Sequence, residues 1–423
     1  MEYKGIIVTG TSGSGKSTVA SKLCEKFDIF QRVQSATTRE KRNDDETGTY
    51  VYLSKEEFSN LEKEGKFITT SPYRGKKYGI KVEDYKKVTQ RGKVPVMVLT
   101  PEAANQLDKI SQMKNKFMII FLDASDDTLD KRLKKRGENL DTAGTQREID
   151  RRYKDEMWKK ENCPIYCIKN EDTTSVDDII DLIYYLYEYR NTGGLLPKKL
   201  IELMIRCGLL LEDATPDNIE GASYDLRVGD EYFHDGEIKQ LTDQHPFIVM
   251  KPGDYVLVSS KEIANLPKNV AGRFDLSVSL FCKGAILSNG PQIDPGFRGR
   301  LYCLIFNTSN KEIQLKRGEH FATIEFIILV DHTLPYTGKY QNKLKMKDYL
   351  PEVVKASAIN QFKLKMKDYL PEVVKASAIN QLIQDVEKLK RAKWFEKYLP
   401  LILSALAIVA SIVMGVILFF IKK

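Results

Sequence analysis

Short apolar runs alternate with longer amphipathic segments in the first part of the chain. Apolar runs lie at 5–9, 94–99 and 117–122, and a helical pattern follows the first of them at 17–24. Continuous apolar runs bounded by glycine and polar residues are typical of buried parallel strands, and the intervals between them leave room for helices. The pattern predicts an α/β domain with a parallel sheet over residues 1–190.

The pattern changes after the glycine-containing segment 191–194, which we interpret as a short linker. Beyond it, short apolar runs follow one another closely and are separated by turn sequences such as Pro-Gly-Asp at 252–254. Closely spaced strands joined by such turns are typical of an all-β barrel or jelly roll. We predict this architecture for residues 195–332.

The last part of the chain contains a repeat and then an uninterrupted apolar run. The 19 residues at 343–361 recur without change at 363–381, and we interpret residues 339–397 as a basic, helical stalk. Residues 399–421 carry no charge and are numerous enough for a transmembrane helix. Aromatic residues precede this run and two lysines follow it, as at the two faces of a bilayer, although a buried core helix stays the alternative.

The charge of the chain is concentrated in the same region. With 42% hydrophobic and 29% charged residues the composition is that of a folded protein, and the net charge is +8. Residues 339–423 contribute +9, from 16 Lys and Arg against seven Asp and Glu, so the first 338 residues sum to −1. An excess confined to one tail does not indicate a nucleic-acid surface, and we expect no nucleic acid partner. Because basic residues are denser before the apolar run than after it, we predict a single C-terminal membrane anchor, with the N-terminal domains in the cytoplasm.

A phosphate-binding loop follows the first apolar run. Its sequence is G-x-x-x-x-G-K-S, and it lies between an expected strand and an expected helix, which is the context that this motif requires. Its backbone N–H groups and the helix N-terminus would bind phosphate, Lys16 would reach the β- and γ-phosphates, and the Ser17 hydroxyl would hold Mg²⁺. We therefore expect ATP and Mg²⁺, with the nucleotide bound by Gly10, Thr11, Ser12, Gly13, Ser14, Gly15, Lys16, Ser17 and Thr18.

Further motifs in the same domain resemble those of the guanylate kinase family. Besides the phosphate loop, these are S-x-T-T-R-x-x-R at 35–42, the turn Y-x-G-x-x-Y-G at 73–79 and R-L-x-x-R-G at 132–137. The resemblance implies that Lys16 is catalytic together with arginines of a mobile lid, and that a second set of residues holds the phosphate of an acceptor. The lid arginines would be Arg132, Arg136 and Arg152, the acceptor phosphate would be held by Ser35, Arg39, Arg42, Tyr50 and Tyr78, and Asn170 would lie near the adenine of ATP.

The base-reading positions depart from that family. Thr69 stands where the family has a glutamate, and Met97 and Leu99 stand where it has acidic residues on a strand. A carboxylate pairs with the N1–H and N2–H₂ groups of guanine, and its loss leaves those donors unpaired. We therefore predict an ATP-dependent kinase that acts on another nucleoside monophosphate or on another small phosphorylated acceptor.

Residues 195 to about 330 resemble the dCTP deaminase and dUTPase family. The resemblance rests on A-S-Y-D-L-R-V-G at 222–229 and I-D-P-G-F-R-G at 293–299. It implies a distorted jelly roll that assembles as a homotrimer, with nucleotide sites between subunits to which Ser279 and Asp294 would belong.

The catalytic positions of this second family are mostly replaced. Both arginines of its R-S-S-L-x-R stretch are absent, with Ser277 and Cys282 in their places, and its general acid/base glutamate falls on Leu304. Leucine cannot transfer a proton, so we expect no deaminase or dUTPase turnover.

These expectations describe a membrane-anchored, nucleoside monophosphate kinase-like protein with a dCTP deaminase-like second domain. Two alternatives stay open. One is a nucleotide-sensing, trimeric membrane scaffold with little catalysis. The other is a bifunctional enzyme whose second domain still deaminates dCTP or hydrolyses dUTP.

Overall fold

The computed structural model describes residues 3–42, 47–138, 140, 142–288, 290 and 292–349. All of them belong to one compact unit, Met1–Leu350. The apolar run predicted to cross a membrane, at 399–421, and most of the predicted stalk lie outside the described residues. Within the part of the chain that is described, no helix has the length and apolar character needed to cross a bilayer.

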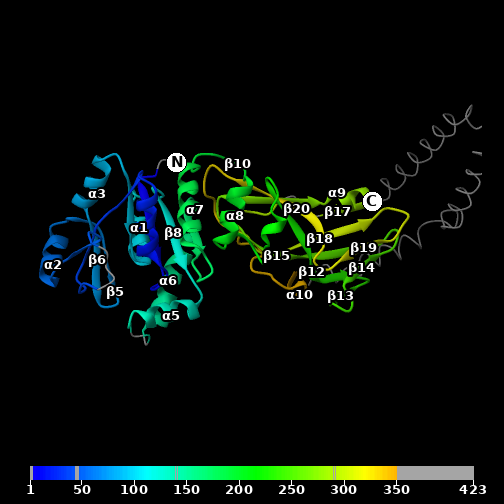
Figure 1. Ribbon diagram of the computed structural model, residues 1–423, viewed down its shortest axis with the longest axis horizontal. Helices are drawn as coiled ribbons and strands as arrows, with labels where there is room; N and C mark the ends of the chain where they lie inside the picture. Colours follow the sequence, from blue (N-terminus) through cyan, green and yellow to red (C-terminus); the bar gives the residue numbers. More distant parts are fainter. Residues whose placement is uncertain are drawn as a thin grey trace, which may run out of the picture. The chain divides into compact units, whose positions relative to one another are not determined.

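A five-stranded parallel sheet forms the centre of the first domain (Figure 1). The strand order is β2-β7-β1-β8-β9, so the strand that precedes the phosphate loop lies in the middle. The strands are β1 (Gly5–Gly10), β2 (Phe30–Arg32), β7 (Val94–Val98), β8 (Phe117–Asp123) and β9 (Ile165–Lys169). The predicted parallel α/β domain is confirmed.

Helices cover both faces of this sheet. Ile6 and Val8 of β1 pack in the cluster that contains α1 (Lys16–Lys26) and α7 (Val176–Glu188), whereas Ile7 packs with α4 (Pro101–Leu107) and α6 (Ala143–Trp158). This division follows because successive side chains of a strand point to opposite faces of the sheet. The other helices of the domain are α2 (Lys55–Lys63), α3 (Val82–Gln90) and α5 (Asp126–Lys135).

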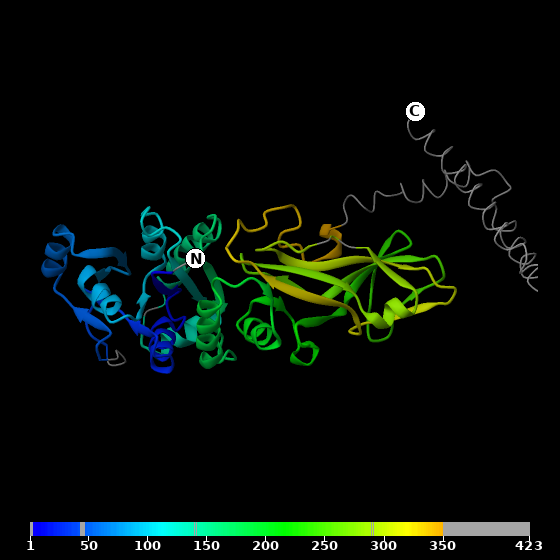
Figure 2. The same ribbon diagram turned by 90° about the horizontal axis from the view of Figure 1, so that it is seen from above.

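A second, four-stranded sheet carries the S-x-T-T-R-x-x-R segment. Its order is β4-β3-β6-β5, and its strands, with α2 and α3, are drawn in blue tones in Figure 2. They are β3 (Ser35–Thr37), β4 (Tyr50–Tyr52), β5 (Phe67–Tyr73) and β6 (Lys76–Lys81). Helix α2 begins with a capping box, in which the Ser54 Oγ accepts from the Glu57 N–H at 3.1 Å and the Glu57 carboxylate accepts from the Ser54 N–H at 2.7 Å.

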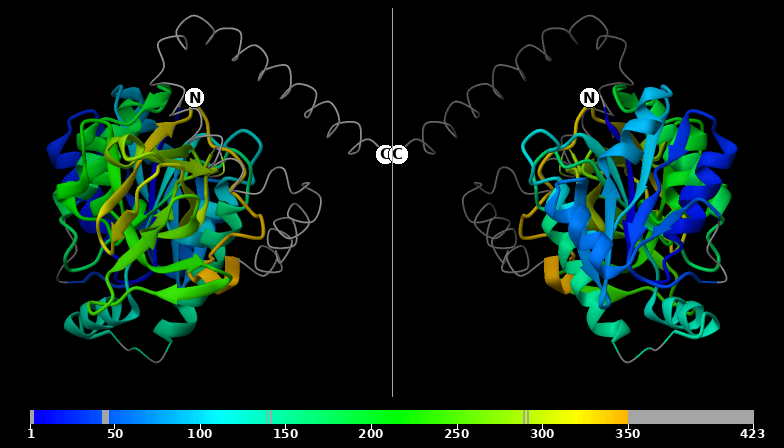
Figure 3. Two further views of the ribbon diagram at one scale, coloured as in Figure 1. Left: turned by 90° about the vertical axis from the view of Figure 1, so that its right-hand side faces the viewer. Right: turned by 90° about the vertical axis from the view of Figure 1, so that its left-hand side faces the viewer.

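The second domain is a curled antiparallel sheet, drawn in green to yellow in Figure 3. The order β10-β20-β12-β15-β18-β17 runs through its nine strands, with β11, β13 and β16 paired off this path. The strands are β10 (Gly194–Leu195), β11 (Leu210–Glu212), β12 (Ser223–His234), β13 (Glu237–Gln240), β15 (Tyr255–Asn265), β16 (Val270–Leu276), β17 (Ala285–Ser288), β18 (Arg298–Asn307) and β20 (His320–Ile328). A separate pair is formed by β14 (Phe247–Met250) and β19 (Ile313–Lys316), and the helices are α8 (Lys198–Arg206), the short 3₁₀ turn η1 (Pro216–Asn218), α9 (Val278–Cys282) and α10 (Met346–Tyr349).

The second domain packs against β9, the edge strand of the parallel sheet. Lys268, fully buried, donates from Nζ to the carbonyl oxygens of Lys160 at 2.5 Å and Cys163 at 3.2 Å, just beyond the end of α6. The Asn269 amide donates to the Tyr166 hydroxyl at 2.8 Å, and the Tyr166 ring meets the buried His332 ring edge-on. These contacts join the second domain to β9 and to the segment just before it.

Candidate active site

The phosphate loop connects β1 to α1 and depends on glycines in the left-handed region. Gly13 and Gly15 have φ of 84° and 90°, and a Cβ on Gly15 would lie only 2.5 Å from Nδ2 of Asn170. That Asn170 nitrogen donates to the Ser14 carbonyl oxygen at 2.8 Å. Asn170 therefore lies against the phosphate loop. Of the predicted loop residues, Gly10, Ser12, Gly13, Gly15, Lys16 and Ser17 line the cleft, whereas Thr11 and Ser14 are buried behind it and Thr18 is exposed on α1.

The ammonium of Lys16 folds back over this loop. Its Nζ donates to the carbonyl oxygens of Thr11 at 2.7 Å and Gly10 at 3.1 Å. Burial lowers the pKa of Lys16 from 10.5 to about 8, and the nearby Asp150 carboxylate opposes that shift. A cation whose ammonium donates to neutral carbonyls gains when an anionic phosphate replaces them, so the residue is poised for a phosphate ligand.

A half-buried ion pair supports the loop from beneath. Asp123 ends β8, accepts from the Thr11 hydroxyl at 3.0 Å and pairs with Arg151 of α6, whose Nε lies 2.9 Å from Oδ2. Sequence reasoning missed both residues. The signal was available for Asp123, because it directly follows a predicted parallel strand, and the carboxyl ends of such strands form the ligand-binding edge of an open α/β sheet.

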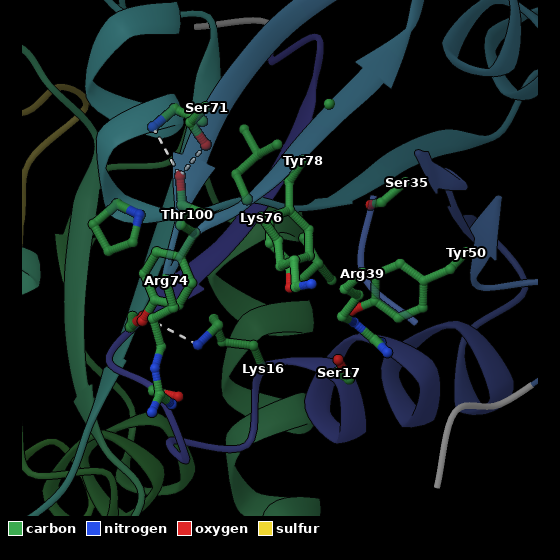
Figure 4. A pocket seen from close by; sticks show the side chains of 18 of the residues that line it. Lys16, Ser17, Ser35, Arg39, Tyr50, Ser71, Arg74, Lys76, Tyr78 and Thr100 are labelled. Atoms are coloured by element: carbon green, nitrogen blue, oxygen red, sulfur yellow. Dashed lines mark hydrogen bonds between the residues drawn. The ribbon is translucent and has the colours of Figure 1, made fainter. Parts of the chain in front are cut away.

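A cleft of about 600 Å³ opens between the phosphate loop and the four-stranded sheet. Figure 4 shows Ser35, Arg39 and Tyr50 on one side of it and Lys16 between that group and Thr100. The structure thus brings together Lys16, Ser17, Ser35, Arg39, Arg42, Tyr50, Tyr78 and Arg136 as lining residues of one cavity.

The residues predicted to hold the acceptor phosphate bring hydroxyl groups and guanidinium groups to the same cleft. The Ser35 Oγ is buried and has no hydrogen-bond partner among the described residues. The Arg39 guanidinium lies 4.6 Å from the centre of the Tyr50 ring and donates to the Glu40 carbonyl oxygen at 2.9 Å. Burial raises the pKa of the Tyr78 hydroxyl, although Arg39 acts to lower it, so this hydroxyl is a hydrogen-bond donor at neutral pH. These are groups that recognise a phosphate.

Hydroxyl and aliphatic side chains line the opposite side of the cleft. The hydroxyls of Ser71 and Thr100 lie 2.6 Å apart (Figure 4), and Thr69, Val98 and Leu99 line the same cleft. Met97 differs from the expectation, because its side chain is fully buried in the core cluster beside α4 and does not line the cleft. Sequence reasoning missed Ser71 and Thr100, since two uncharged hydroxyls, one on β5 and one at the start of α4, form no recognisable motif.

The three predicted lid arginines occupy different surroundings. Arg136 lines the cleft beside Glu138, which pairs with Arg42 at 3.2 Å and with Arg74 at 2.6 Å. Arg132 instead pairs with Asp172 at 2.8 Å and donates to the Asn170 carbonyl oxygen. The exposed Arg152 lies over the Tyr153 ring and does not belong to the residues that line the cleft.

The two residues predicted for a site in the second domain are exposed. Ser279 lies on α9, where its hydroxyl is 3.1 Å from that of Ser277, and Asp294 accepts from the Gln292 amide at 3.1 Å. Leu304, which stands at the expected general-acid position, lies on β18 paired with Leu257. A cavity of about 250 Å³ on this domain is lined by other described residues, among them Glu231 and Arg300.

Comparisons with known proteins match the two domains separately. A sequence model of the guanylate kinase family matches residues 2–175, and a model described as dCTP deaminase-like matches residues 195–329. The chain is 30% identical over 185 residues to a guanylate kinase of Fusobacterium nucleatum, an alignment that covers 42% of this chain and 94% of that protein.

Relatives of the second domain are more similar. The chain is 36% identical over 143 residues to a dCTP deaminase of Pyrococcus horikoshii, which covers 34% of this chain and 90% of that protein. It is 37% identical over 138 residues to a dCTP deaminase of Thermococcus kodakarensis, with 32% of this chain and 88% of that protein covered. By these similarities the chain belongs to the guanylate kinase family in its first domain and to the dCTP deaminase-like family in its second.

Proposed function

We propose that the first domain transfers the terminal phosphoryl group of ATP to a nucleoside monophosphate other than GMP. The observation that carries this proposal is a single cleft with the phosphate loop on one side, a second phosphate-recognising group at Ser35 and Arg39, and no carboxylate at Thr69. Phosphoryl transfer depends on positioning and on neutralising charge, and these residues supply both.

The wall that would face the acceptor base offers hydroxyls. Ser71 and Thr100 share one hydrogen bond, and the Thr100 hydroxyl also accepts from the Ala103 N–H at 3.1 Å, which leaves one O–H group and two lone pairs to meet a base edge. Guanine presents two neighbouring donors, N1–H and N2–H₂, and a buried donor left unpaired costs about 1–3 kcal/mol. A base whose edge has no two neighbouring donors, such as cytosine, uracil, thymine or adenine, suits this pair of hydroxyls better.

The residues at the phosphate loop fit Mg²⁺ and ATP. Ser17 follows Lys16 at the start of α1 and lines the cleft, so its hydroxyl is available as a metal ligand. A bound Mg²⁺ would neutralise phosphate charge. Lys16 would orient the transferred group, and Arg136 would approach it when the segment that carries Glu138 moves away from Arg42 and Arg74.

For the second domain we propose a structural or nucleotide-sensing role without turnover, within a homotrimer. Leu304 offers only hydrocarbon where the family's glutamate transfers a proton, and Ser277 and Cys282 replace the two arginines. The 36% identity to a dCTP deaminase favours a second candidate, in which other residues of this domain still act on a deoxycytidine or deoxyuridine triphosphate. We further propose that residues 399–421 anchor the chain in a membrane, with both domains facing the cytoplasm.

Separate incubations of the same full chain test the two domains. The full chain is mixed with Mg²⁺, ATP and one nucleoside monophosphate at a time, then with dCTP or dUTP alone, and all products are separated by chromatography. We expect a diphosphate from a monophosphate other than GMP, its loss in Lys16→Met, and no dUTP or dUMP from the triphosphates. Formation of dUTP from dCTP, or of dUMP from either triphosphate, by both the natural chain and Lys16→Met would establish the second candidate instead.

A further inference from the structure

The last described residues of the chain occupy a groove on the second domain. This groove is formed by Glu231, Phe233, Leu257, Arg300 and Tyr302, on strands β12, β15 and β18. The side chain of Met346 is fully buried in it, in one cluster with Phe233 and Tyr302. A buried methionine contributes the hydrophobic stabilisation of a core residue, so this is a specific contact.

Backbone hydrogen bonds fix the same segment. The Arg300 N–H donates to the Lys343 carbonyl oxygen at 3.0 Å, and Arg300 Nε donates to the Leu344 carbonyl oxygen at 3.0 Å. The Met346 N–H donates to the Glu231 carboxylate at 2.7 Å. These bonds set the register at which the segment lies in the groove.

Tyr349 closes the groove from the other end of α10. Its ring lies 4.3 Å from that of Tyr302 and is stacked on that of Tyr340 at 4.4 Å. The groove therefore recognises a methionine and a tyrosine three residues apart, together with the backbone just before them.

Every segment residue named in these contacts except Tyr340 falls inside the tandem repeat. Lys343, Leu344, Met346 and Tyr349 recur after 20 residues as Lys363, Leu364, Met366 and Tyr369. The second copy lies outside the described residues, but its sequence contains the whole recognition pattern.

We propose that the groove is a docking site for the sequence Lys-Leu-Lys-Met-Lys-Asp-Tyr-Leu, and that the second copy, residues 363–370 of the same chain, is its alternative occupant. The proposal is independent of the nucleotide chemistry. A loop of 20 residues costs little more to close than a shorter one, so the second copy can reach the groove once the first copy leaves it.

Residues just before each copy of the repeat favour the first copy over the second as the occupant of the groove. Asn342 adopts a φ of 60°, a conformation that asparagine tolerates and a bulky residue resists, and the second copy has Phe362 there. The second copy also has Asn360 where Tyr340 stacks on Tyr349. The first copy is therefore the preferred occupant.

Exchange of the two copies changes the tether between the second domain and the apolar run. With the first copy docked, 48 residues (351–398) separate the segment from that run, and with the second docked, 28 residues (371–398) do. The duplication then sets two tether lengths between the folded domains and whatever residues 399–421 bind.

Four full-length chains in detergent test the proposal: the natural chain, Met346→Asp, Met366→Asp and the double variant. The probe is a fluorescent peptide with the sequence of residues 343–350, and its binding is followed by anisotropy. A peptide with Asp in place of Met is the control. Because one copy remains to fill the groove in each single variant, we expect the double variant to bind the peptide at least tenfold more tightly than either single variant.

Equal peptide affinity in Met346→Asp and in the double variant would overturn the proposal, because the second copy would then not enter the groove. Tyr349→Ala and Tyr369→Ala, singly and together, repeat the comparison without a buried charge, in case the aspartate variants fail to fold. If Met346→Asp forms a larger assembly than the double variant, the occupant comes from a second chain, and the assignment to the same chain is overturned.

Discussion

The Nδ2 atom of Asn170 lies 2.8 Å from the carbonyl oxygen of Ser14 and ties the end of β9 to the phosphate loop. The preceding residue, Lys169, donates its backbone N–H to the Cys207 carbonyl oxygen of the second domain at 3.0 Å. Two consecutive residues thus connect the nucleotide loop to the neighbouring domain, so this strand end should control how firmly the loop is held.

Removal of the Asn170 amide tests that connection. In Asn170→Ala the buried Ser14 carbonyl loses its donor, at a cost of about 1 kcal/mol or more, so we expect the affinity for Mg²⁺-ADP to fall about five- to tenfold. Isothermal titration calorimetry measures the affinity, and the exposed Asn60→Ala on α2 is the matched control. Unchanged binding in Asn170→Ala would show that the loop does not depend on this bond.

The pKa of Lys16 predicts proton uptake on nucleotide binding. Burial holds this pKa at about 8 in the free protein, so a large share of Lys16 is neutral at pH 8.5. An anionic phosphate favours the ammonium form and raises the pKa, so the protein must take up a proton when the nucleotide binds.

Calorimetry in buffers of different ionisation enthalpy measures this uptake. We expect uptake at pH 8.5, almost none at pH 6.5, and its loss at both values in Lys16→Arg, which stays charged. Equal proton uptake at the two pH values would contradict the predicted titration.

The low pKa of His332 predicts that the folded state loses stability in acid. Burial, and then the charge of Lys268, lower the pKa of His332 from 6.5 to about 3. Between these values the unfolded chain binds a proton that the folded chain does not, so stability is lost as the pH falls below about 6.5. At pH 5 the loss amounts to about 2 kcal/mol.

Denaturant unfolding at pH 7 and pH 5 checks this sign. Between pH 7 and pH 5, we expect the unfolding free energy of His332→Phe to fall by about 2 kcal/mol less than that of the natural chain. Phenylalanine has no titrating group but keeps an aromatic ring beside Tyr166. The exposed His245→Phe is the control, and a pH dependence that is the same in both variants would remove His332 as the cause.

Arg151 and Arg152 are neighbours on α6 that we expect to act on different steps. Arg151→Gln breaks the pair with Asp123 beneath the phosphate loop and should weaken Mg²⁺-ADP binding about tenfold. Arg152→Gln should leave that affinity unchanged and lower kcat by about a hundredfold or more, as for an arginine that meets charge only in the transition state. If Arg152→Gln keeps its full kcat, this residue does not belong to the lid.

The parts of the fold that follow from local sequence were predicted correctly. The strands at 94–98 and 117–123 and the phosphate loop are continuous segments whose periodicity or spacing carries the information. The closely spaced strands of the second domain were likewise visible from its short runs and turns.

Features that depend on distant pairs were not predictable. The Ser71–Thr100 hydroxyl pair joins β5 to the start of α4, and the Asp123–Arg151 pair joins β8 to α6. Lys268 gives no sign in the sequence that it is buried, because only the packing of a second domain against β9 removes it from water. The register that sends Met97 into the core instead of the cleft is likewise set by tertiary pairing of β7.

A competition between acceptors tests the central claim most directly. Equal concentrations of the common ribo- and deoxynucleoside monophosphates are mixed in one tube with the full chain, Mg²⁺ and ATP, and the initial rate of each diphosphate gives the relative kcat/KM. We predict that a diphosphate of another base forms at least about a hundredfold faster than GDP or dGDP, because no carboxylate meets guanine at Thr69. If GDP is the main product, guanine recognition is intact and the account is wrong.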